Sequence, residues 1–230
     1  MPEQIARLLD PAWLVPAVIA VLLLVPRTRS LLGPVTTIYH EFGHALVGVL
    51  FGARVAGIRV FFDGSGEARL AHPPGARRRI GRAMSLWAGY LTPPLTGMGL
   101  LALVLLGREP WPLAATVAVG LAVLLFIRNW QGLLVMLLYL GALALAAIDW
   151  RGFGDGIVSG IASLLIIGGV LDLLRTGPLV VRGRRETDFH FLARESRLPF
   201  PPLAHYAVYC LVVAALLAAA GAGIVSLLPR

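Results

Sequence analysis

Lysine is absent from the sequence, and cysteine and charged residues are scarce. The single cysteine, Cys210, excludes a disulfide bond within the chain. Only 14% of the 230 residues are charged and 58% are apolar, whereas soluble domains are usually roughly 45 to 50% apolar. The mean hydropathy is +0.82. Together these values indicate an integral membrane protein whose main surroundings are a lipid bilayer.

All 20 basic residues are arginines, and the formal net charge is +8. Such an excess favours nucleic-acid binding when it covers a soluble surface. Here the arginines lie mostly in the connections between apolar stretches, where basic residues usually set the orientation of a membrane protein. We therefore expect no nucleic-acid partner.

Apolar runs of near-membrane-spanning length fill most of the sequence. A transmembrane helix needs about 20 apolar residues to cross a hydrocarbon core of roughly 30 Å. Seven runs approach this length, and the first and fourth are short enough to be tilted or only partly inserted. They cover residues 12–26, 31–51, 83–106, 112–127, 131–149, 156–174 and 204–228. The sequence therefore predicts an all-α fold, a polytopic transmembrane helix bundle of six to seven spans that forms a single domain over residues 1–230.

The first apolar run is expected to stay in the mature protein. Glu3 and Asp10 precede it, and no small-residue cleavage site follows it, so it does not have the pattern of a secretory signal peptide.

The two long polar connections, 52–82 and 175–203, fall on the same side of the membrane as the N-terminus in the seven-span arrangement. That side then holds 15 of the 20 arginines. Because arginine accumulates in cytoplasmic loops, we expect the N-terminus and both connections to be cytoplasmic.

The 52–82 connection contains a hairpin pattern. Residues 55–62 follow the alternating pattern of a β-strand, residues 63–66 form a Gly-rich turn, and residues 67–71 form a second, shorter strand-like run. One interpretation is a compact loop with no further role. The other is an edge strand that binds an extended substrate by strand addition.

The sequence His40-Glu41-Phe42-Gly43-His44 lies inside the second apolar run. On a helix, histidines four residues apart share one face and can bind one Zn²⁺. The Glu between them is then the general base that takes a proton from water at the metal. The alternatives are a buried His–Glu hydrogen-bond network, or a metal site without proteolysis.

A catalytic zinc usually has three protein ligands, so a third ligand is needed. His40 and His44 fall in the cytoplasmic half of their span, which places Glu109, Asp149 and Asp155 on the wrong side of the membrane. Asp172 and Asp188 remain on the correct side. Asp172 could instead pair with Arg175, and Asp188 could instead begin a helix, so these arguments leave both candidates open.

Several short stretches resemble the site-2 protease superfamily, and more closely its compact bacterial B-type branch, along most of the chain. They are Thr37 to Leu46, Ala88-Gly89-Tyr90-Leu91 with Pro93, Arg128-Asn129 with Gly132, Gly168-Gly169, and Thr187-Asp188 followed by Leu192-Ala193-Arg194 and Pro199. The resemblance implies a bacterial cytoplasmic membrane and a zinc cofactor, and it favours Asp188 over Asp172 as the third ligand. The branch typically has Ser-Asp-Ala where this sequence has Thr187-Asp188-Phe189.

The usual superfamily element of Asn and Pro followed by Leu-Asp-Gly is missing, and Asn129 occupies roughly its place without the Asp. Asn129 and Arg128 are predicted to bind the substrate backbone or the oxyanion. A topology anchor is the alternative role for Arg128.

These observations predict an intramembrane zinc metalloendopeptidase that cuts a membrane-protein substrate in or near a transmembrane segment, with Glu41 as general base. The rival hypothesis is a zinc-binding membrane protein without protease activity, or an inactive relative that binds clients. A structural zinc site would need a fourth protein ligand, and His190 is the histidine to examine because it lies two residues from Asp188; the others are His72 and His205.

Overall fold

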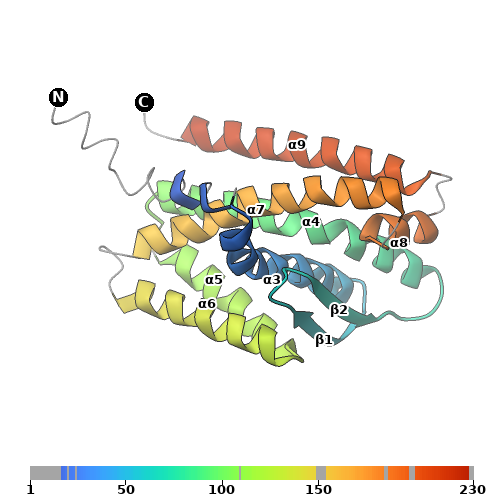
Figure 1. The fold of residues 1–230 in the computed structure, drawn as a ribbon, viewed down its shortest axis with the longest axis horizontal. Coiled ribbons are helices and arrows are strands. Elements are labelled where there is room, and N and C mark those ends of the chain that lie inside the picture. Colours follow the sequence, from blue (N-terminus) through green and yellow to red (C-terminus); the bar gives the residue numbers. More distant parts are fainter. Residues whose placement is uncertain are drawn as a thin grey trace.

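The computed structural model describes residues 17–19, 21–23, 25–108, 110–148, 154–183, 186–196 and 200–227. Most of these residues are helical, and one small antiparallel sheet is inserted between the first two long helices (Figure 1). The elements are α3 (Pro26–Leu50), β1 (Arg54–Val60), β2 (Gly66–Ala71), α4 (Ala76–Leu105), α5 (Trp111–Phe126), α6 (Trp130–Ile148), α7 (Asp155–Arg182), α8 (Asp188–Glu195) and α9 (Pro202–Leu227).

Four described helices are long and apolar enough to cross a membrane: α4, α6, α7 and α9. A fifth candidate is the pair formed by residues 17–23 and α3, if the two count as one span with a bend of 108°. The prediction of six to seven spans is therefore not confirmed. Seven of the 15 residues of the expected 12–26 span lie outside the described residues, and α5 has 16 residues, which at 1.5 Å per residue gives about 24 Å.

The predicted hairpin is present. β1 and β2 pair antiparallel from Arg54↔Ala71 to Val60↔Gly66, with a register irregularity between Val55 and Gly57. The other edge of β1 is occupied as well, because the Arg128 N–H donates to the Ile58 carbonyl oxygen at 2.9 Å. Among the described residues, no strand pairs with the outer edge of β2.

The hairpin folds back along α3. Thr37 Oγ1 on α3 donates to the Gly64 carbonyl oxygen in the turn at 2.6 Å, and a Cβ on Gly33 would lie 3.9 Å from Gly64 Cα. Gly33 is 17 residues from the end of α3, or about 26 Å along the helix axis. The 52–82 connection was expected on the cytoplasmic side, and its hairpin packs beside α3.

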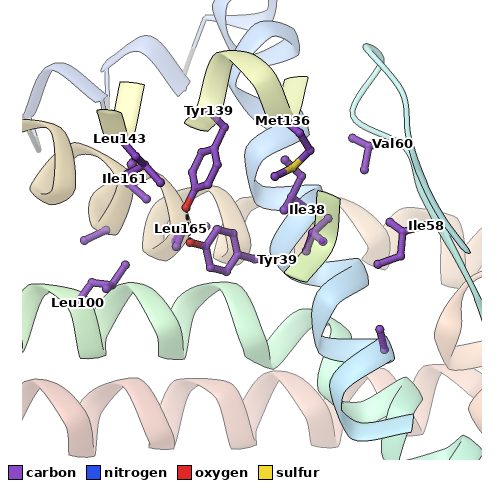
Figure 2. Packing of buried hydrophobic residues seen from close by; sticks show 13 residues of the cluster. Ile38, Tyr39, Ile58, Val60, Leu100, Met136, Tyr139, Leu143, Ile161 and Leu165 are labelled. Carbon is purple, nitrogen blue, oxygen red and sulfur yellow. Dashed lines mark hydrogen bonds between the residues drawn. The ribbon is translucent and has the colours of Figure 1, made fainter. Parts of the chain in front are cut away.

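Apolar residues on β1 explain this placement. The buried side chains of Ile58 and Val60 join a core that includes Ile38 of α3 and Met136 of α6 (Figure 2). The Ile58 carbonyl oxygen and both backbone groups of Val60 are hydrogen-bonded to residues 128 and 129, so this end of β1 can lie in apolar surroundings with those polar groups paired.

Two clusters fix the helices that carry the site. In the first, the hydroxyls of Tyr39 on α3 and Tyr139 on α6 lie 2.6 Å apart inside the core (Figure 2). In the second, Phe189 of α8 packs with Leu173 and Val180 of α7 and with Tyr209 of α9. The first cluster therefore fixes α3 against α6, and the second docks α8 onto α7 and α9.

Candidate metal centre

Two histidines of α3 and one carboxylate of α8 converge at one point. The Nε2 atoms of His40 and His44 lie 2.9 Å apart. Asp188 Oδ2 lies 3.2 Å from Nε2 of His40 and 3.4 Å from Nε2 of His44. Their ligand atoms all lie within 4.8 Å of one another. The i,i+4 spacing on α3 thus produces the shared face that the sequence predicted.

The first turn of α8 holds Asp188 in place. Thr187 is the N-cap, and His190 Nδ1 accepts a hydrogen bond from the Thr187 N–H at 3.2 Å and lies 3.0 Å from Thr187 Oγ1. This reciprocal pair is a capping box with His in the place of the usual Glu or Gln. His190 is therefore engaged in the helix cap and does not join the three ligand candidates.

Phe189 anchors α8 through an aromatic group. Its side chain is 2% exposed, and its ring centroid lies 5.6 Å from that of Tyr90, 5.2 Å from that of Tyr206 and 5.4 Å from that of Tyr209. Tyr90 also packs edge-on against His40 at 4.4 Å. Tyr90 therefore contacts His40, a ligand candidate on α3, and also Phe189, which anchors the helix that carries Asp188.

The orientation of His44 is set by α4. His44 Nδ1 donates to the Ser85 carbonyl oxygen at 2.7 Å, and Ser85 Oγ donates to the His44 carbonyl oxygen at 2.8 Å. A proton on Nδ1 leaves the lone pair of Nε2 free to face His40 and Asp188. Backbone carbonyls commonly orient metal-binding histidines in this way.

Close packing between α3 and α4 depends on glycine. A Cβ on Gly89 would lie 2.5 Å from His44 Cε1 and 2.8 Å from His40 Cε1. On the facing helix, a Cβ on Gly43 would lie 2.9 Å from the Ala88 carbonyl oxygen. The Ala88-Gly89-Tyr90 stretch, noticed in the sequence only as a resemblance, thus lies directly against the two imidazoles.

Glu41 lies between the histidines and β2. The residue is 5% exposed, and a Cβ on Gly66, the first residue of β2, would lie 2.6 Å from Glu41 Oε1. The carboxylate therefore lies beside both the metal-ligand candidates and the start of the open sheet edge.

The three residues suit a zinc ion. Ligand atoms about 2.0 to 2.1 Å from a tetrahedral metal lie roughly 3.4 Å from one another, close to the observed separations of 2.9 to 3.4 Å. Burial alone would raise the pKa of Asp188, but the imidazoles of His44 and His40 hold it well below its usual range. The carboxylate is then ionised, as metal binding requires.

These residues open onto a cavity of about 980 Å³. His40, Glu41, His44 and Asp188 all line it. A cavity of this size can admit an extended peptide segment as well as water.

Asp172, the rival third-ligand candidate, lines the same cavity but is not part of the three-residue group. Its Oδ1 lies 3.9 Å from Arg175 Nη1, which is the ion pair considered as its alternative role. Asp155 begins α7, 17 residues before Asp172, or about 26 Å along the helix. Glu109 and Asp149 lie outside the described residues.

Asn129 and Arg128 lie between α5 and α6 and bond to residues of β1. The Asn129 side chain accepts from the Val60 N–H at 3.2 Å and donates to the Val60 carbonyl oxygen at 2.7 Å. Arg128 Nη1 donates to the carbonyl oxygens of Leu125 and Ile127. Neither residue lines the cavity, so their predicted contact with the oxyanion stays a prediction without a structural contact.

Sequence reasoning overlooked Ser85 and Gly89. Ser85 orients the His44 ring through its backbone carbonyl, which any residue type has, and its hydroxyl bonds only to a backbone oxygen, so no sequence pattern could single it out. Gly89 stands in a quoted motif, but only the packing of α3 on α4 shows which side chains it faces.

The model of one protein family, described as Peptidase M50B-like, matches residues 13–221. No curated protein and no solved structure matches the chain. The matched region includes α3 with His40 and His44, α8 with Asp188, and the apolar helices that indicate an integral membrane protein. The chain therefore belongs to the Peptidase M50B-like family, within the site-2 protease superfamily.

Proposed function

We propose that this protein is an intramembrane zinc metalloprotease that hydrolyses a peptide bond in or near a transmembrane segment of another membrane protein. The observation that carries the proposal is the convergence of His40, His44 and Asp188 within 4.8 Å, with buried Glu41 beside them on one open cavity.

His40, His44 and Asp188 would hold the metal. A zinc ion with three protein ligands acidifies a water molecule and polarises the scissile carbonyl group. Glu41 accepts the proton from the attacking water and passes it to the amide nitrogen as the C–N bond breaks. Water oxygen thereby becomes part of the new carboxyl group, and the other product leaves as an amine.

The substrate is proposed to pair with the outer edge of β2. A helical peptide bond is shielded, so the segment to be cut must first become extended, and strand addition stabilises that form. Gly66 brings this edge next to Glu41. In this arrangement Asn129 supports the site indirectly, because it hydrogen-bonds both backbone groups of Val60 on β1.

A structural zinc site would have four protein ligands. Among the described residues, the group that could hold a metal consists of His40, His44 and Asp188, without a fourth member. His190 caps α8 and His205 lies 3.2 Å from Ser196 Oγ. The described donor set therefore favours an open coordination position, which a catalytic site needs.

The proposed location is a bacterial cytoplasmic membrane, with the N-terminus and both long connections, 52–82 and 175–203, entering from the cytoplasmic side. The arginine distribution supports this orientation. The proposed partners are the bilayer and membrane-protein substrates, with no nucleic acid.

The test is cleavage of a single-span reporter by purified protein in detergent or nanodiscs, comparing wild type with Glu41→Gln. We expect Glu41→Gln to keep its zinc and lose at least about 100-fold in rate, since it removes the proton acceptor. A chelator should abolish wild-type cleavage, and added zinc should restore it. Equal cleavage by the two forms would contradict the proposal; zinc binding without cleavage of any reporter would favour an inactive relative.

A further inference from the structure

The cavity that contains the metal-ligand candidates has an arginine-rich rim. Arg78 and Arg82 at the start of α4, Arg69 of β2 and His72 just after β2 line the same cavity as His40 and Glu41. These four residues, Arg69, His72, Arg78 and Arg82, form the rim.

The rim charges are only partly balanced. Arg69 pairs with Glu67 at 2.9 Å, and Arg82 pairs with Glu195 at 2.7 Å. Arg78 is exposed and, among the described residues, forms no ion pair. One guanidinium group at the mouth of the cavity is thus free to bind an anion.

His72 responds to the same positive potential. Its pKa is lowered first by burial, then by the neighbouring charges of Arg82 and Arg78, with a smaller opposing effect of Glu195. Two positive charges, of Arg82 and Arg78, and one negative charge, of Glu195, therefore act on the part of the cavity beside His72.

The distance from this rim to the candidate general base is set by β2. Gly66, the first residue of the strand, lies against Glu41, and Ala71, the last, precedes His72. Five residues of extended chain cover about 17 Å. A substrate strand paired with β2, with its scissile bond at Glu41, therefore passes Arg69 about three residues away and reaches the His72 end of the rim about five residues away.

We propose that the preferred substrates carry acidic residues about five positions from the scissile bond, where the extended segment passes the rim. This inference rests on the proposed protease function. Carboxylates form strong, often bidentate hydrogen bonds with guanidinium groups. An acidic peptide is favoured over a lipid headgroup because the rim belongs to the same cavity as Glu41 and lies at a strand-defined spacing from it.

The experiment compares two single-span reporter peptides. On each flank of the scissile bond they carry a run of three residues centred five positions away, and these residues are Glu in one peptide and Arg in the other. The full-length protein is assayed in nanodiscs of neutral lipid. We expect wild type to cleave the acidic peptide about three- to tenfold more efficiently, as for other partly exposed charge pairs, and the difference to shrink at high salt.

Charge reversal gives the sharper test. Arg78→Glu should invert the preference, so that the Arg peptide becomes the better substrate, with unchanged zinc content. Arg79→Glu is the matched control, because Arg79 is exposed on the same turn of α4 but does not line the cavity. The control should retain the preference for the acidic peptide.

Three outcomes overturn the inference: equal cleavage of both peptides by wild type, an equal effect of Arg78→Glu and Arg79→Glu, or loss of the preference when anionic lipid is added, which would make the rim a headgroup site. Binding of both peptides to Glu41→Gln is measured in parallel. If neither peptide is cut but the acidic one binds more tightly through Arg78, the protease proposal fails while the charge preference stands.

Discussion

Gly89 of α4 lies directly against the imidazole of His44, and a Cβ at this position would be 2.5 Å from His44 Cε1 and 2.6 Å from His44 Nε2. The two imidazoles can approach each other and Asp188 only because α4 presents no side chain there. This contact makes Gly89 a positioning residue for the metal centre.

Gly89→Ala should therefore lower zinc affinity by at least about tenfold, the lower range for changes that misorient metal ligands. The matched control is Gly99→Ala on the same helix, where a Cβ would meet nothing within 4 Å. Competition with a fluorescent zinc chelator measures both variants. A normal zinc affinity in Gly89→Ala would show that the imidazoles can move aside.

The Asp188→Ala and Asp172→Ala variants should differ in their zinc content. Asp188→Ala removes a group within 3.4 Å of both histidines and should lower zinc affinity by at least about 100-fold, as expected for the loss of one ligand among three. Asp172→Ala should retain zinc, because Asp172 lies outside the three-residue group. The zinc content of both variants is measured after dialysis. Zinc loss in Asp172→Ala alone would make Asp172, and not Asp188, the third ligand.

Phe189→Ala should weaken zinc binding although Phe189 contacts no metal. Loss of a buried Phe costs about 3 to 5 kcal/mol, and here that cost falls on the docking of α8, which carries Asp188. Phe191→Ala in the same helix is the control, because Phe191 is only half-buried and packs near the Arg82 and Arg194 side chains. Zinc titration of both variants, together with thermal unfolding with and without zinc, checks this. Equal zinc affinities would mean that Asp188 is held without the aromatic anchor.

Asn129→Ala should loosen the hairpin and leave the metal in place. The change leaves two backbone groups of Val60 without their partners, at a cost of about 1 to 3 kcal/mol. Hydrogen exchange should increase across β1, and cleavage should fall. Arg128→Ala should have little effect on hydrogen exchange or on cleavage, since the Arg128 side chain is exposed and bonds to carbonyls close to it in sequence. Lost cleavage with unchanged exchange in β1 would instead support the oxyanion role predicted from the sequence.

Local features of the site were predictable. His40 and His44 share a face because of helix geometry alone, and the Gly-rich turn at 63–66 indicated a hairpin. The choice between Asp172 and Asp188 required tertiary structure, because both lie on the expected side of the bundle. Only the docking of Phe189 shows which carboxylate reaches the histidines.

The position of the hairpin was not predictable from its pattern. Alternating residues on β1 define a buried face, but not the element that covers it. The structure shows Ile58 and Val60 packed against α3 and α6. The role of Asn129 was hidden for a similar reason, since a side-chain amide that pairs with a strand backbone leaves no periodic signal.

The distance in sequence between His40 and Asp188 has a consequence for biosynthesis. The two residues are 148 positions apart, and at about 5 to 20 residues per second the ribosome needs roughly 7 to 30 seconds to add the second after the first. During that interval the nascent chain has the histidine pair and Glu41 but lacks the carboxylate of α8. The complete donor set therefore forms only after the helices up to α7 have been made, so the metal centre is assembled late in synthesis.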